Sequence, residues 1–144
     1  MYKTRGFALF CSFLFLTLIA TSVDAQPRTR QRTKKSVLII NSYHPYLSWS
    51  DSLNKGISKE LQREGIDFEI YTENLDAKRQ PLSKTFNELQ SFIAAKYADI
   101  NIDLIFVTDN DALLFMEKIG DLLFPNKPVV FCGINNITRF KSNY

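Results

Sequence analysis

Residues 35–51 read KSVLIINSYHPYLSWSD, an apolar run that stops at a polar and aromatic loop. Positions 36–40 have no helical period and are rich in β-branched residues, which predicts a strand buried on both faces. Positions 41–50 then carry amide, hydroxyl, imidazole, phenol and indole groups. An open parallel sheet binds its ligands just beyond the carboxyl ends of its strands. This loop is therefore the leading candidate for the working surface.

The rest of the chain alternates between strand and helix patterns. Apolar positions at helical spacing predict helices over 49–63, 81–97 and 112–123. Shorter apolar runs predict strands at 68–71, 103–107 and 129–132. Polar loops are expected at 72–80 and 133–136. Helix starts carry capping signals: Ser48 with Asp51 resembles a capping box, and Asp109 or Asn110 is placed to cap the third helix.

This alternation predicts an α/β fold with a parallel sheet of four strands, in the order 2-1-3-4, and helices on both faces. In that order the connections diverge between the first and third strands. The loops at 41–50 and 108–111 therefore meet across one crevice, and 133–136 borders it.

The amino-terminal part of the chain differs from the rest. Residues 1–25 have a basic start, an apolar core and a small-residue site, which predicts a signal peptide or an uncleaved anchor and an extracytoplasmic or periplasmic location. Residues 26–35 form a basic linker. From residue 36 onward, 11 Lys and Arg face 14 Asp and Glu, a formal net charge of −3. This charge argues against a nucleic-acid partner, and we expect membrane contact only through the first segment.

Several functions need residues that the sequence does not place in this predicted crevice. Dinucleotide or phosphate binding needs glycines after the first strand, and 41–50 contains none. A phosphorylated receiver domain shares the strand order and has an acidic acceptor where Asp109 stands. It also needs carboxylates after the first strand to hold magnesium, whereas this chain has Asn41 and Ser42 there. We expect no cofactor.

The reactive side chains leave alternatives open. Asp109 and Asp111 could bind a metal or act as an acid–base pair. The simpler alternative is that they cap the third helix, where the helix dipole favours negative charge. His44, the single histidine, either contacts a ligand or stabilises its loop. Cys132 lies in an apolar run, so a small buried hydrophobe is a simpler interpretation than a catalytic thiol. We therefore predict neither a metal site nor an enzyme.

Aromatic side chains with polar tips favour a small-molecule pocket instead. Tyr43, Tyr46 and Trp49 could stack on a planar or apolar ligand group. The helical spacing of Trp49 makes core packing an equal alternative. Nearby Asn and Ser side chains could bond a ligand or simply satisfy turn backbones.

Four blocks in this order resemble one known family: VLIINSYHPYLSWSDSLNKGI, YTENLDAKR, DLIFVTDNDALLFM and LFPNKPVVFCGINN. They are similar to the amino-terminal lobe of the type I periplasmic-binding-protein-like domain of ABC transporter substrate-binding proteins. The same domain occurs as the extracytoplasmic input region of sensor histidine kinases and diguanylate cyclases. The resemblance covers roughly residues 37–136, within an expected lobe over 36–136.

The resemblance implies two α/β lobes that close over a small molecule. Residues 137–144 would begin the crossover to a second lobe, so the expected cleft is half present, as in a fragment or a lobe completed by a partner. A sensory input region that signals to a membrane kinase or cyclase is the leading expectation, the solute-binding component of a transporter is the alternative, and a metal-dependent enzyme using Asp109 and Asp111 is the third. The resemblance places these residues beside the ligand: Ser42, Tyr43, His44, Trp49, Asp109, Asn110, Asp111 and Asn135.

Overall fold

The computed structural model describes residues 34–135. The expected signal segment (1–25), most of the basic linker and the expected crossover (137–144) lie outside the described residues. Strands and helices alternate along the described chain, in the order β1 (Lys35–Asn41), α2 (Ser48–Arg63), β2 (Phe68–Asn74), α3 (Leu82–Tyr97), β3 (Leu104–Thr108), α4 (Asp109–Leu123) and β4 (Val129–Cys132).

The four strands form one parallel sheet in the order β2-β1-β3-β4, which confirms the predicted fold class and strand order. Val37 on β1 lies opposite Ile70 on β2 and Leu104 on β3. The fold is α/β and is consistent with one lobe of a periplasmic-binding-protein-like fold. All four carboxyl ends therefore lie along one edge of the sheet.

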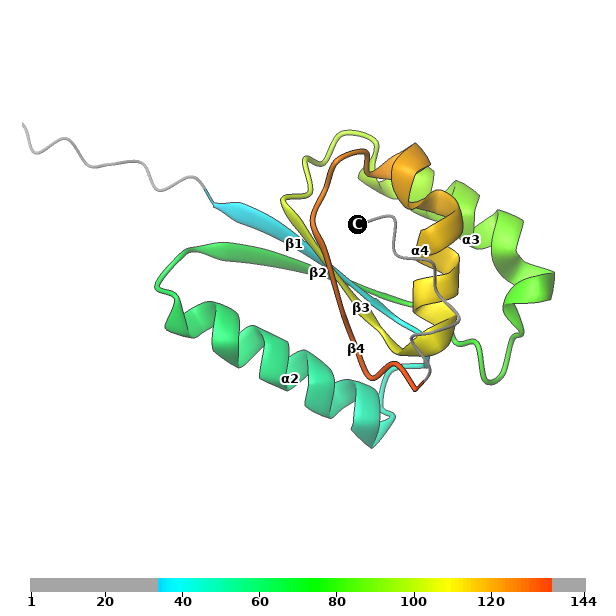
Figure 1. Cartoon of the computed structure of the whole chain (residues 1–144), viewed down its shortest axis with the longest axis horizontal. Coiled ribbons are helices and arrows are strands. Elements are labelled where there is room, and N and C mark those ends of the chain that lie inside the picture. The colour runs from blue at the N-terminus through cyan, green and yellow to red at the C-terminus, as the bar shows by residue number, and fades with distance from the viewer. Residues whose placement is uncertain (1–33, 136–144) are drawn as a thin grey trace, which may run out of the picture. The chain divides into compact units, whose positions relative to one another are not determined.

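Helices cover both faces of this sheet: α2 lies on one side, and α3 and α4 lie on the other (Figure 1). On the α3 and α4 face, Leu38, Ile105 and Phe115 belong to the larger apolar core. On the α2 face, Val37 and Ile39 pack with partners that include Ile57 and Leu61 of α2. Because successive side chains of β1 point to opposite faces, this one strand contributes to both cores.

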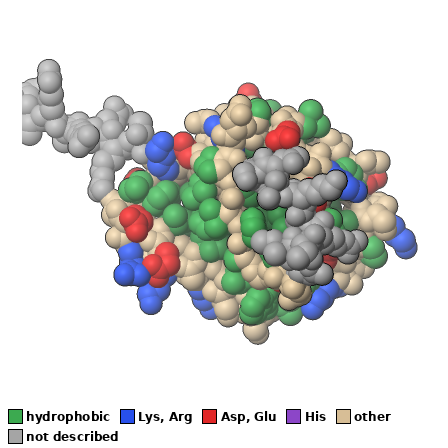
Figure 2. Space-filling view, in the orientation of Figure 1, with side chains coloured by type: hydrophobic (Ala, Val, Ile, Leu, Met, Phe, Trp, Pro, Cys, Tyr) green, Lys and Arg blue, Asp and Glu red, His purple; other side chains and the backbone are tan. Residues whose placement is uncertain are grey.

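Strand β4 is only partly covered by the described residues. Val130 and Phe131 each remain about two-fifths exposed, at 44% and 41%. Figure 2 shows hydrophobic side chains at the surface over the part of the sheet that lies beside α2. None of the helices in the described part of the chain is long and apolar enough to span a membrane.

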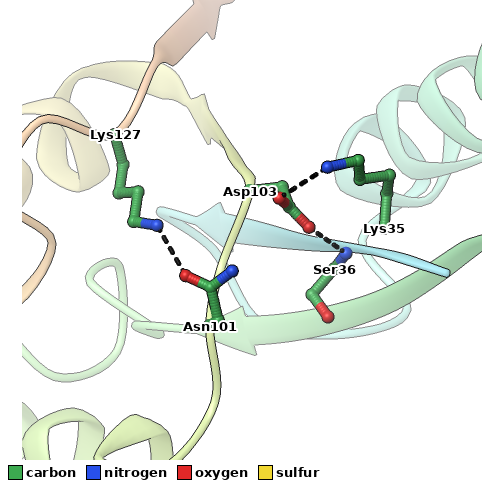
Figure 3. Close-up of polar contacts among 5 residues, drawn as sticks. All are labelled: Lys35, Ser36, Asn101, Asp103 and Lys127. Carbon is green, nitrogen blue, oxygen red and sulfur yellow. Dashed lines mark hydrogen bonds and ion pairs between the residues drawn. The ribbon is translucent and has the colours of Figure 1, made fainter. Parts of the chain in front are cut away.

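A polar cluster holds the amino-terminal edge of the sheet together (Figure 3). Asp103 accepts hydrogen bonds from the backbone N–H of Ser36, at 2.9 Å, and from Lys35 Nζ, at 3.1 Å. These bonds hold the pKa of the Asp103 carboxyl below its ordinary value. Nearby, Lys127 donates to Asn101 at 2.7 Å. The cluster joins the starts of β1 and β3 and so stabilises their register.

Several element boundaries differ from the sequence-based expectation. The segment 72–74 was expected in a loop, yet β2 continues to Asn74 because its backbone pairs with β1 up to Asn41. The Asn41 amide also donates to Asn74 Oδ1 at 3.1 Å. Helix α4 begins at Asp109, three residues before the expected start, and β3 begins one residue later than expected.

The predicted side-chain caps are not formed. The N-cap of α2 is Leu47, without a side-chain cap, and Ser48 lies inside the helix because Asp51 N bonds the Leu47 carbonyl at 3.0 Å. The N-cap of α4 is Thr108, also without its own side-chain cap. Neither Asp109 nor Asn110 caps α4, because a serine from β1's end takes that place.

Candidate functional site

Ser42 is that serine, and it ties the end of β1 to the start of α4. Its hydroxyl donates to the Thr108 carbonyl and accepts from the Ala112 backbone N–H, both at 2.8 Å. Its own N–H also reaches the Thr108 carbonyl, at 3.2 Å. Ser42 has no exposed surface. It therefore lies buried at the carboxyl edge of the sheet and caps α4 from a distant part of the chain.

Trp49 and Asp109 bring α2 and α4 together at the same edge. The indole Nε1 donates to both Asp109 carboxylate oxygens, at 2.9 and 3.2 Å. Trp49 is half exposed, whereas Asp109 retains only 5% of its surface. Of the two alternatives for Trp49, its half-exposed side chain argues against packing in the core, and contact with a ligand stays a prediction.

Asp109 has an unusual backbone conformation and a shifted carboxyl pKa. Its φ is +67°, in the left-handed region that residues with a side chain rarely adopt. Burial raises the pKa of its carboxyl, and the hydrogen bond from Trp49 and the charge of Lys78 partly oppose that rise. Strained backbone and a buried carboxylate both cost stability, and such features collect at functional sites.

Gly133, directly after β4, completes the packing around this pair. Its φ is +72°, and a Cβ built there would lie 3.1 Å from Asp109 Oδ1 and 3.4 Å from the Trp49 ring. The chain can approach the carboxylate this closely only without a side chain. The residue pattern predicts this loop at the carboxyl edge of the sheet, without singling out Gly133. A glycine directly after a predicted strand was the available signal.

The next residues extend the contact between the third and fourth strand ends. Asn110 Oδ1 accepts the backbone N–H of Asn135 at 3.2 Å. Asp111 lies in the first turn of α4, where the helix dipole favours a negative charge. The residues that follow β1, β3 and β4 therefore lie along one edge, as the strand order predicted.

The loop after β2 also reaches this edge, and the sequence analysis did not assign it to the site. The Lys78 ammonium nitrogen lies 4.4 Å from the centroid of the Tyr43 ring. Burial raises the pKa of the Tyr43 phenol, and the charges of Asp109 and Asp111 raise it further. Tyr43, Lys78 and the two carboxylates thus share one electrostatic environment. The signal for Lys78 was topological, because every strand of a parallel sheet sends its following loop to the same edge.

Two further aromatic residues of the first loop lie differently. His44 Nδ1 bonds the Pro45 carbonyl at 2.7 Å, which assigns the proton to that nitrogen and favours a loop-stabilising role. Tyr46 has φ +70° and is 89% exposed. Its ring stands in solvent and contributes no packing to the crevice.

Metal and thiol chemistry receive no specific support. Within residues 34–135, no group of three or more His, Cys, Asp or Glu side chains is placed to hold a metal ion. Asp109 also directs both carboxylate oxygens to the Trp49 indole. Cys132 is a half-buried free thiol, and burial together with the charge of Asp109 raises its pKa. A raised pKa disfavours the nucleophilic thiolate.

A hollow of about 460 Å³ lies elsewhere, between α4 and the start of β4. It contains none of the candidate residues. Its lining combines apolar side chains with a few polar ones: Met116, Gly120, Asp121, Phe124, Asn126, Lys127, Pro128 and Val129. We place the candidate site at the carboxyl edge of the sheet instead, because the charged and aromatic groups converge there.

Comparison with known proteins gives no match to any family model, curated protein or solved structure. The resemblance to the periplasmic-binding-protein-like family therefore remains a prediction from the four sequence blocks. The strand order and the convergence of the strand-end loops are what that prediction requires.

Proposed function

We propose that this domain is a small-molecule-binding lobe that works outside the cytoplasm, as the sensory input region of a membrane signalling protein of the histidine kinase or diguanylate cyclase type. The observation that carries the proposal is the edge where the residues that follow the four strands gather around Asp109. Aromatic faces, a buried carboxylate and a lysine converge there from separate parts of the chain. Such a combination of apolar surface and few polar groups is typical of small-molecule sites.

In this proposal the lobe supplies one wall of a cleft and a second lobe supplies the other. Ligand binding would shift the equilibrium between open and closed lobes, because the closed form makes contacts that the open form lacks. A solute-binding component of a transporter would use the same cleft and differ only in the membrane partner that senses closure. The resemblance supports both roles, and the charged edge is common to them.

A thermal-shift screen tests ligand binding. The purified full chain is heated with a library of amino acids, nucleosides and small aromatic acids, and the unfolding midpoint is recorded. We expect at least one compound to raise the midpoint, and we expect Asp109→Ala to abolish that shift. Asp121→Ala is the matched control, because Asp121 is an exposed carboxylate at the other end of the same helix.

The outcomes of the thermal-shift screen distinguish an error in the location of the site from an error in the proposed function. A hit whose shift survives Asp109→Ala would place the pocket elsewhere. A library without a single hit, on protein that is folded by circular dichroism, would count against a binding role. For the enzyme alternative, calorimetric titration with magnesium, manganese and calcium should give no heat at millimolar metal.

A further inference from the structure

We infer that Lys78 is the cationic arm of the candidate site and that it selects ligands that carry an anionic group next to a planar or apolar body. This inference rests on the proposed binding function and adds the charge class of the ligand. It starts from the position of Lys78, which the loop after β2 holds above the ring of Tyr43.

Backbone hydrogen bonds position the Lys78 loop against the end of β1. The N–H of Leu75 bonds the Asn41 carbonyl at 2.9 Å, and the N–H of Ala77 bonds the Ser42 carbonyl at 2.8 Å. Lys78 follows immediately. Its Cα is therefore held beside the end of β1, next to the loop that carries Tyr43, and the flexible side chain only has to reach across the ring.

The two basic side chains of this loop, Lys78 and Arg79, differ in whether they have an ion-pair partner within the described part of the chain. Arg79 is paired within the loop, because its Nε donates to both Asp76 oxygens at 2.7 and 2.9 Å. Lys78 has no carboxylate within ion-pair distance among residues 34–135. It is near enough to Asp109 to affect that carboxyl electrostatically, yet both Asp109 oxygens already accept from Trp49. Among the described residues, the ammonium group of Lys78 is thus a cation at this edge without a direct carboxylate partner.

The position of Lys78 above Tyr43 also indicates the chemistry of the rest of the ligand. A cation over the face of a tyrosine is attracted by the ring, which keeps Lys78 at the carboxyl edge of the sheet. An anionic group that pairs with Lys78 would lie beside Tyr43 and near the half-exposed Trp49. A ring or other planar group attached to that anion could stack on these side chains. The negative charges of Asp109 and Asp111 would repel a second anionic group. We therefore expect the ligand to carry a single anionic group.

Three probes with the same ring and different charge test the inference: phenylacetate, phenylacetamide and phenethylamine. Dissociation constants are measured on the full chain by the fluorescence of Trp49, the single tryptophan of the sequence. We expect phenylacetate to bind at least tenfold more tightly than the amide or the amine. Lys78→Gln should weaken phenylacetate at least tenfold and leave the amide unchanged, and Lys78→Arg should keep most of the affinity.

Lys84→Gln is the matched control, because Lys84 is an exposed lysine in the first turn of α3. Equal affinity for the acid and the amide in the wild-type chain, or equal weakening of both by Lys78→Gln, would overturn the charge-selecting role and leave the binding lobe intact. If another library compound binds and phenylacetate does not, the same variants are applied to that compound. A neutral or cationic hit that ignores Lys78→Gln then rejects the inference, and an anionic hit that Lys78→Gln weakens supports it. Failure of every compound removes the binding function and this inference together.

Discussion

Trp49 donates its indole N–H to both carboxylate oxygens of Asp109, at 2.9 and 3.2 Å, and so joins the first turn of α2 to the first residue of α4. The two residues are 60 positions apart in the chain. Burial nevertheless keeps the pKa of Asp109 above its ordinary value, because one neutral donor does not replace the water that the carboxylate has lost. The pair therefore combines a buried charge with a strained backbone at the centre of the candidate site.

The buried charge predicts that Asp109 lowers stability at neutral pH. Its folded pKa lies above the unfolded value of about 3.9. The stabilising contribution is therefore present below that pH and is lost as the pH rises through the folded pKa. Asp109→Asn keeps an oxygen for Trp49 and tolerates positive φ, so we expect it to raise the unfolding free energy at pH 7 by roughly 1 kcal/mol.

Urea unfolding of wild type and Asp109→Asn at pH 7 and pH 3 measures this effect. The difference should shrink at pH 3, where the carboxyl of Asp109 is protonated in both folded and unfolded chains. A variant that is less stable than wild type at pH 7 would mean that the charged hydrogen bond to Trp49 outweighs the cost of burial.

Gly133 should not tolerate a side chain. Gly133→Ala combines a positive φ with a Cβ that would lie 3.1 Å from Asp109 Oδ1, so we expect it to lower the unfolding free energy by about 1–2 kcal/mol. The fluorescence of Trp49 should also change, because its ring would have to move. Chemical unfolding followed by circular dichroism gives the stability.

Gly56→Ala is the control for Gly133. Gly56 lies in the middle of α2, and a Cβ there meets nothing within 4 Å. Alanine should stabilise the helix by about 0.5–1 kcal/mol. The two glycine variants should thus shift stability in opposite directions, and a Gly133→Ala chain as stable as wild type would contradict the assigned role of Gly133.

The buried hydroxyl of Ser42 should be important for stability. Ser42→Ala leaves the Ala112 N–H buried without a partner and removes one bond to the Thr108 carbonyl. We expect a loss of about 2 kcal/mol in the urea unfolding free energy. Ser52→Ala removes a similar hydroxyl, on the exposed side of α2, whose only bond is to the Ser48 carbonyl. This control should stay within about 0.5 kcal/mol of wild type.

The cluster at the amino-terminal edge predicts a pH dependence of the opposite sign. The pKa of Asp103 is lowered, so its stabilising contribution is present above the unfolded value of about 3.9 and is lost as the pH falls through the folded pKa. Asp103→Asn weakens the contacts to Lys35 and Ser36. We expect it to cost about 1 kcal/mol at pH 7, since the side chain is partly exposed.

The check is an acid titration of stability in the two chains. Wild type should lose more unfolding free energy than Asp103→Asn between pH 5 and pH 2. Asp99→Asn changes an exposed carboxylate close by in the sequence and should behave as wild type. Parallel pH curves for wild type and Asp103→Asn would show that Asp103 contributes nothing to the acid sensitivity.

The sequence by itself was sufficient for the class of fold and for a prediction of where the site lies. Apolar runs separated by helical periods predict alternating strands and helices, and the right-handed crossover rule then leaves few strand orders. Tyr43, Trp49 and Asp109 could be placed at one edge for this reason, before any contact was known. The limit of pattern reading appears at 72–74, where polar residues look like a loop but the backbone pairs with β1. A hydrophobic pattern indicates which side chains are buried. A strand can still pair with its neighbour through backbone hydrogen bonds where its side chains are polar.

Only the tertiary structure decided what each side chain of the site contacts. The sequence left Ser42 open as a ligand contact or a turn residue, and it caps α4 because the strand order places the ends of β1 and β3 together. Trp49 meets Asp109, and Lys78 meets Tyr43, across 60 and 35 positions of chain. No local pattern encodes such pairs, since they depend on how separate elements pack. Periodicity therefore determined the scaffold, and packing determined which residues of the loops meet.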